Sequence, residues 1–142
     1  STLEETVNTG STFIASELTF KAMNQKSPEK EIPTAKADKT DRFLVSFLLQ
    51  NNITPLKNAE VFLVLTDPNG IVIQNDQWQS GAEVSKKDGV YKYTRKINFE
   101  YTKGEQKKIA LPIQLARYTE GLYSVQVYHN GLKIGKYDLR LN

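Results

Sequence analysis

Trp78 has the side chain best suited to recognising another molecule. It is the single tryptophan of the chain and lies in the run Asn75-Asp76-Gln77-Trp78-Gln79-Ser80, where planar amides surround one indole. A flat apolar ring beside amide hydrogen-bonding groups suits contact with a sugar or a peptide. Tyr91 and Tyr93 add two aromatic rings further along the chain. We take Trp78, Tyr91 and Tyr93 as candidate ligand-binding residues; the alternative for Trp78 is a structural role, closing one end of the fold.

His129 is the only histidine, so any Ser-His-Asp arrangement would depend on it alone. It directly precedes Asn130-Gly131, the dipeptide most typical of a tight β-hairpin turn. We therefore expect a solvated turn residue there and not a general base. One histidine is also too few for a histidine-rich metal site.

The acidic residues do not form an obvious catalytic or metal-binding set. Oxygen-bearing side chains gather between positions 67 and 76, and calcium prefers six to eight such ligands. However, Asp67-Pro68-Asn69-Gly70 is accounted for as a turn, since proline presets its own φ and glycine accepts a positive φ. Glu60 and Glu100 are isolated on predicted strands, and the chain has no cysteine. We predict no enzymatic activity, no metal and no cofactor.

The basic residues do not indicate nucleic-acid binding. Lys92, Arg95 and Lys96 lie near two tyrosines, a mixture found where single strands stack on aromatic rings. Strand alternation, however, places the lysines on the face opposite Tyr91 and Tyr93. The net charge is only +3 over 142 residues, so we expect a solvated strand face and no nucleic-acid partner.

The length fits one domain. The polar segment from Ser1 to Ser11 is interpreted as a linker, or as the tail of an upstream helical region, and residues 12–142 as the folded domain. No stretch approaches 18 consecutive apolar residues, so we predict that this segment does not insert into a membrane.

Eight segments have the apolar pattern of strands, and turn signals separate them. Two are apolar on both faces, which is typical of central strands (Phe43–Leu49 and Val61–Leu65). The others are Phe13–Ala22, Ile71–Ile73, Val90–Tyr101, Ile109–Leu115, Tyr123–Tyr128 and Leu132–Leu141. Pro112 predicts that its strand lies at an edge or carries a bulge, since proline has no backbone donor. Gly135 predicts a bulge, because the apolar parity changes there. The fold class we predict is an all-β, immunoglobulin-like antiparallel β-sandwich of seven or eight strands.

The long polar stretch from Lys26 to Arg42 has one large aliphatic residue, Ile32. Such a composition buries little apolar area. We predict a largely solvated connection that crosses the end of the sandwich from one sheet to the other, with at most a short edge pairing near Ile32.

The run from Gly121 to Gly131 resembles the penultimate strand of many bacterial immunoglobulin-like modules, in which Gly-x-Tyr-x-Val-x-Val precedes a tight hairpin. From Lys36-Ala37-Asp38-Lys39 onward, the chain is also similar to uncharacterised β-sandwich domains of bacterial envelope proteins. The resemblance implies a non-catalytic interaction or structural module, periplasmic or on the cell surface, that binds a protein or glycan partner through loops or sheet edges. The alternative is a carbohydrate-binding module that uses exposed aromatics such as Trp78.

Overall fold

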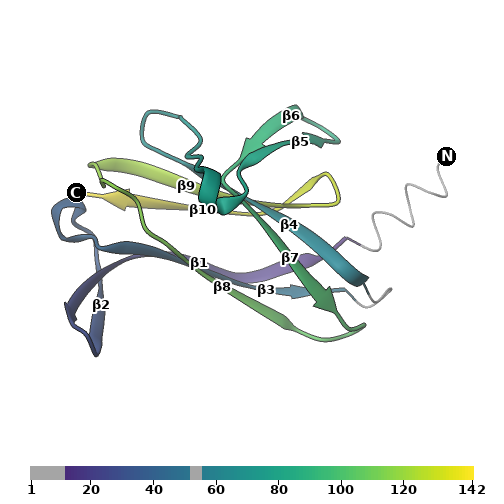
Figure 1. Ribbon diagram of the computed structural model, residues 1–142, viewed down its shortest axis with the longest axis horizontal. Helices are drawn as coiled ribbons and strands as arrows, with labels where there is room; N and C mark the ends of the chain where they lie inside the picture. Colours follow the sequence, from purple (N-terminus) through teal and green to yellow (C-terminus); the bar gives the residue numbers. More distant parts are fainter. Residues whose placement is uncertain (1–11, 52–55) are drawn as a thin grey trace.

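The structure, a computed structural model, describes residues 12–51 and 56–142. The predicted linker, residues 1–11, lies outside the described residues. Within them the protein is all-β, with two short 3-10 turns, η1 (Ala37–Lys39) and η2 (Asp76–Trp78). Figure 1 shows the antiparallel strands, and the described residues hold ten of them in three sheets. The prediction of seven or eight strands was therefore too low.

The first sheet has the strand order β2-β1-β3-β8. Its strands are β1 (Ile14–Ser27), β2 (Lys30–Thr34), β3 (Arg42–Gln50) and β8 (Lys107–Ile113). β8 is an edge strand, one of the two places that Pro112 predicted. Proline has no N–H to donate, and the free side of an edge strand needs no donor. β3 is central and buries every second residue, whereas Leu44 and Leu48 are half-buried on the outer face.

The second sheet has the order β10-β9-β4-β7. It consists of β4 (Leu56–Thr66), β7 (Arg95–Tyr101), β9 (Gly121–His129) and β10 (Leu132–Leu141). The Asn130-Gly131 turn joins β9 to β10 with a positive φ at both residues, as predicted. The register of that pair shifts between Lys133 and Gly135, which confirms the predicted bulge.

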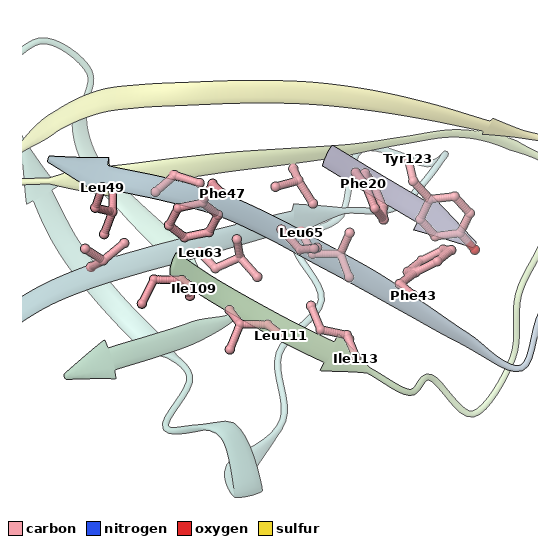
Figure 2. Close-up of a cluster of buried hydrophobic side chains, with 14 of the residues drawn as sticks. Phe20, Phe43, Phe47, Leu49, Leu63, Leu65, Ile109, Leu111, Ile113 and Tyr123 are labelled. Atoms are coloured by element: carbon pink, nitrogen blue, oxygen red, sulfur yellow. The ribbon is translucent and has the colours of Figure 1, made fainter. Parts of the chain in front are cut away.

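The main core fills the space between these two sheets (Figure 2). Phe43 of β3 lies at one end of it, 4.9 Å from the Phe20 ring and 5.0 Å from the Tyr123 ring, with edge-on geometry in both contacts. Edge-to-face packing of this kind matches the electrostatics of aromatic rings. Strands from both sheets therefore share one continuous apolar interior.

A third, two-stranded sheet covers part of the outer face of the second. β5 (Gly81–Ser85) and β6 (Gly89–Tyr93) form a hairpin, and Tyr93 packs 4.8 Å from Phe62 of β4. Phe62, Val64, Tyr93 and Tyr128 form a second buried cluster there. This explains why β4 is apolar on both faces, as the sequence indicated.

The segment Val90–Tyr101 is not the single strand predicted. The chain leaves β6 and enters β7 at Thr94, so Tyr91 and Tyr93 join the outer cluster, whereas Ile97, Phe99 and Tyr101 pack on the main core. An unbroken period-2 pattern concealed this change of sheet, because the side-chain parity is the same before and after Thr94.

β1 contains a bulge, and the positions that are buried change parity on either side of it. Glu17 has a φ of 52°, and the register against β3 shifts between Ser16 and Thr19. The inserted residue reverses the parity. Phe13 is consequently buried and Ile14 is 71% exposed, whereas Phe20 and Ala22, of opposite parity, are buried further along.

The polar stretch from Lys26 to Arg42 is more ordered than predicted. β1 extends to Ser27 and turns directly into β2, whose residue Ile32 pairs with Asn24. The edge pairing near Ile32 is thus confirmed, but the crossing between sheets is wrong, because β2 stays in the first sheet. Ala37 then donates its backbone N–H to the carbonyl of Asn142 at 2.9 Å.

Candidate binding site at Trp78

Trp78 ends the short η2 turn, and local hydrogen bonds fix its backbone. Asn75 caps the turn, since its side chain accepts the Gln77 N–H at 2.6 Å. The Trp78 N–H donates to the Asn75 carbonyl at 3.2 Å. Gln79 then adopts a left-handed conformation with a φ of 57°, which ends the turn.

Two side chains tie this loop to the junction between β6 and β7. Ser80 Oγ accepts the Asn75 N–H at 2.9 Å and donates to the carbonyl of Thr94. Gln74 Nε2 donates to the carbonyls of Gly81 and Tyr93, at 2.9 Å and 3.2 Å. The loop therefore has a defined position relative to the sheets.

Thr94 connects this junction to the centre of the second sheet. It is fully buried. Its Oγ1 accepts the Leu65 N–H at 2.8 Å, and its own N–H donates to the Leu63 carbonyl at 2.8 Å. The loop that carries Trp78 is thus connected to β4 in two steps, from Ser80 to Thr94 and from Thr94 to Leu63 and Leu65.

The opposite wall is the connection between β8 and β9. Tyr118 OH accepts the Leu115 N–H at 3.0 Å and donates to the Asp41 carbonyl at 3.2 Å. Its ring packs edge-on against Phe43 at 4.9 Å. Burial raises the pKa of the Tyr118 hydroxyl, so the group stays protonated and keeps both bonds.

Two adjoining hollows open between these walls, and Trp78 borders both. The first has a volume of about 420 Å³ and the second about 770 Å³. Five residues of mixed character border both hollows (Asn75, Trp78, Gln114, Leu115 and Ala116). Asp67 and Arg117 border the first hollow and Arg42, paired with Glu31, borders the second. The site therefore combines an indole and neutral amides with charged groups of both signs.

Trp78 is partly buried and packs against the main core. It also borders the hollows, so contact with the core and contact with a ligand are compatible for this residue. Sequence reasoning missed the partners from the β8–β9 connection. No local signal marks them, since Tyr118 meets Asp41 across 77 positions.

Tyr91 and Tyr93 lie on the other side of the second sheet from these hollows. Tyr93 is buried against Phe62. The Tyr91 ring stacks on Tyr128, with centroids 4.1 Å apart and planes inclined by 19°. The structure does not bring these two rings together with Trp78. Each already packs against one neighbouring ring, Tyr91 on Tyr128 and Tyr93 on Phe62.

His129 is buried, so the expectation of a solvated turn residue was wrong. Its Nδ1 accepts the Phe13 N–H at 3.0 Å, and its ring lies 4.5 Å from the Phe13 ring. Burial, with a smaller effect of Lys86, lowers the pKa of His129 to about 4. The imidazole is consequently neutral near pH 7, with Nδ1 committed to a backbone bond.

The Asp67 carboxylate has a structural role in its turn. Asp67 Oδ1 accepts the N–H groups of Asn69 and Ile71, at 2.9 Å and 3.0 Å, which confirms the predicted turn. In the part of the chain that the structure describes, no three acidic or histidine side chains gather to hold a metal ion. The same residues include no helix long and apolar enough to span a membrane.

These features define a class: all-β proteins with two facing antiparallel sheets, here with two hollows among the loops beside Trp78. Residues 16–142 match a family described as a domain of unknown function, DUF8428, and the chain belongs to that family. No curated protein matches it.

Two solved structures share the fold. β-Glucosidase 3B from Thermotoga neapolitana, in complex with glucose, is 13% identical with a TM-score of 0.54, covering 93% of this chain and 16% of that one. The Pseudomonas fluorescens alkylpurine DNA glycosylase AlkC, bound to DNA containing an abasic site analog, is 15% identical with a TM-score of 0.52, covering 99% of this chain and 36% of that one. The chain thus spans well under two thirds of either protein, and the likeness concerns the fold alone.

Proposed function

We propose that this chain is a non-catalytic interaction module with an immunoglobulin-like fold, and that it binds a partner through its loops and sheet edges. The observation that carries the proposal is Trp78, fixed by hydrogen bonds and bordering two adjoining hollows. A rigid aromatic side chain at a concave surface is the kind of residue that dominates binding energy. The resemblance of its C-terminal strands favours a place in the bacterial envelope, periplasmic or on the surface.

The use of the single histidine also supports a non-catalytic role. A general base needs a free lone pair within reach of a substrate proton. His129 Nδ1 is already an acceptor for a backbone N–H, and the side chain is only 8% exposed.

The test is retention of partners from a bacterial envelope extract by immobilised chain, with the wild type, Trp78→Ala and Leu122→Ala compared. Leu122 is the control because it is a large apolar residue, 41% exposed, on the central strand β9, neither in a loop nor on a sheet edge. We expect Trp78→Ala to retain about tenfold less of the main partner than the wild type does. Equal retention by all three proteins would contradict the proposal.

A carbohydrate-binding module is the second candidate, because amide side chains surround the indole (Gln74, Asn75, Gln77 and Gln114). Amides donate to and accept from hydroxyl groups, while an indole packs on the apolar face of a sugar ring. Trp78 is the only tryptophan, so its fluorescence reports on the site directly. Titration with a broad panel of soluble glycans should shift the emission, and an unchanged spectrum across the panel would remove this candidate.

A further inference from the structure

Edge strands leave one row of backbone groups unpaired, and proteins usually protect them with proline, charged side chains or bulges. Every edge strand of the two large sheets carries such a feature within the described residues. β2 and β8 each contain a proline, β10 has a bulge, and β7 begins with two basic residues (Pro33, Pro112, Gly135, Arg95 and Lys96).

β5 is less protected. Gly81–Ser85 contains no proline, bulge or basic residue, and its one charged side chain is Glu83. Within the described residues β6 is its only sheet neighbour, and Gln74 donates to the Gly81 carbonyl at its beginning. Val84 and Val90 lie directly opposite each other on the outward face, 66% and 73% exposed. The hairpin therefore combines an edge that only Glu83 protects with an exposed apolar pair.

The inner face of this edge borders a separate hollow of about 440 Å³. Glu60 and Phe62 of β4 line it, together with Glu83 of β5. Glu60 pairs with Lys96 at 3.2 Å, whereas Glu83 has no ion pair within the described residues. Glu83 thus presents a carboxylate without an ion pair beside this edge, and Lys86 is the one other charged side chain, besides Glu60, that borders the hollow.

The charge on β5 disfavours a second copy of the chain as the added strand. Antiparallel pairing of all five residues of β5 with themselves places Glu83 opposite Glu83. Like charges directly opposite each other destabilise a strand pair, whereas opposite charges stabilise it. A strand with a basic residue at that position is complementary to β5.

We propose that β5 accepts an extended segment of a partner protein as an added strand. The segment carries a lysine or arginine opposite Glu83, flanked by β-branched apolar residues that continue the outward surface of Val84 and Val90. Main-chain hydrogen bonds provide the affinity, and the alternating side chains provide the selectivity. This inference rests on the proposed function and specifies one of its binding surfaces.

The probes are two acetylated and amidated peptides, Thr-Val-Lys-Val-Thr and Thr-Val-Glu-Val-Thr, titrated into isotope-labelled chain and followed by backbone amide NMR shifts. We expect shifts centred on residues 81–85 with the lysine peptide, and about fivefold weaker binding of the glutamate peptide. Glu83→Lys should reverse this preference. Glu83 is exposed, so this variant keeps the fold, which the dispersion of its own spectrum verifies.

The proposal is overturned if neither peptide shifts residues 81–85 at millimolar concentration, or if Glu83→Lys leaves the preference unchanged. Thr102→Val, at an exposed position in the turn after β7, is the control variant, and it should bind the lysine peptide like the wild type. The two proposals can fail separately. If retention of a partner from the envelope extract depends on Trp78 while neither peptide binds the chain, the proposed function stands and this inference alone is removed.

Discussion

The imidazole of His129 anchors the beginning of β1. It accepts the Phe13 N–H through Nδ1, while the neighbouring Asn130 side chain donates to Thr12 Oγ1 at 3.0 Å. Only a neutral imidazole has a free lone pair on Nδ1. Protonation would replace this acceptor by a second N–H facing the Phe13 N–H, so the contact between the first strand and the β9–β10 turn depends on pH.

We predict that the protein loses stability as the pH falls from about 6.5 to about 4. The folded-state pKa of His129 is about 4 and the ordinary value is 6.5, so between these values the unfolded chain binds more protons. Linkage then gives a free energy of unfolding about 2 kcal/mol lower at pH 5 than at pH 7 from this residue. Urea unfolding at the two pH values measures the difference. His129→Asn, which keeps an acceptor but does not titrate, should abolish this part of the dependence.

Thr94 should be sensitive to the loss of a single oxygen. Thr94→Val keeps the shape but leaves the buried N–H of Leu65 without its 2.8 Å acceptor. An unsatisfied buried donor costs about 1–3 kcal/mol. We expect that loss in urea unfolding, whereas Thr102→Val, at an exposed position, should stay within about 0.5 kcal/mol. Equal effects would mean that the Thr94 hydroxyl does not stabilise the junction.

At the scale of elements, the β1–β2 hairpin determines how the polar stretch from Lys26 to Arg42 behaves. Arg42 and Glu31 form a bidentate pair across it, with Arg42 Nε 2.8 Å from Glu31 Oε2. The pair is half-buried, and a bidentate arginine–carboxylate pair is the geometry in which an ion pair contributes measurably. Strand hydrogen bonds and this one ion pair therefore both keep the segment in place.

We predict slow tryptic cleavage at Lys26 and Lys30, comparable with cleavage at Lys92 and Lys96. A protease needs an extended, unpaired backbone, so a strand must first open locally. Lys103, in the exposed turn after β7, is the control and should be cut first. Mass spectrometry of early fragments measures the order. Early cleavage at Lys26 and Lys30 with the remaining strands intact would show that the hairpin opens independently.

The elements with a strong local pattern were predictable from the sequence. Turns with fixed residue preferences, such as Asp67–Gly70 and Asn130-Gly131, are correct, and so are the edge position of Pro112 and the bulge at Gly135. β5 was missed because it is short and has only one large aliphatic residue, Val84. The change of sheet at Thr94 was missed because it depends on bonds to Leu63 and Leu65, about 30 positions earlier.

The candidate site was predictable only in part, for the same reason. Trp78 stands out by type and by its amide neighbours. The pairing of Tyr91 with Tyr128, and the burial of His129 against Phe13, depend on contacts between distant positions. A period in the sequence identifies faces of a strand, but it does not show which strand will cover them.

At the scale of the whole molecule, Trp78 contacts the main core that both large sheets share. We therefore predict a single cooperative unfolding transition. Urea titrations followed by tryptophan fluorescence and by far-ultraviolet circular dichroism should give the same midpoint, as two-state behaviour requires. Trp78→Phe, monitored by circular dichroism alone, controls for effects of the probe. A fluorescence transition at lower urea would show that the η2 loop unfolds separately.

The bond between Phe13 and His129 also has a consequence for synthesis on the ribosome. Its two residues are 116 positions apart, and translation adds about 5–20 residues per second. The start of β1 thus leaves the ribosome at least several seconds before its acceptor exists. Until then Phe13 has no buried site, and the nascent chain exposes a large aromatic side chain. Among the described strands, β1 would be the first that chaperones for extended apolar segments meet, and it would be among the last to reach its final place.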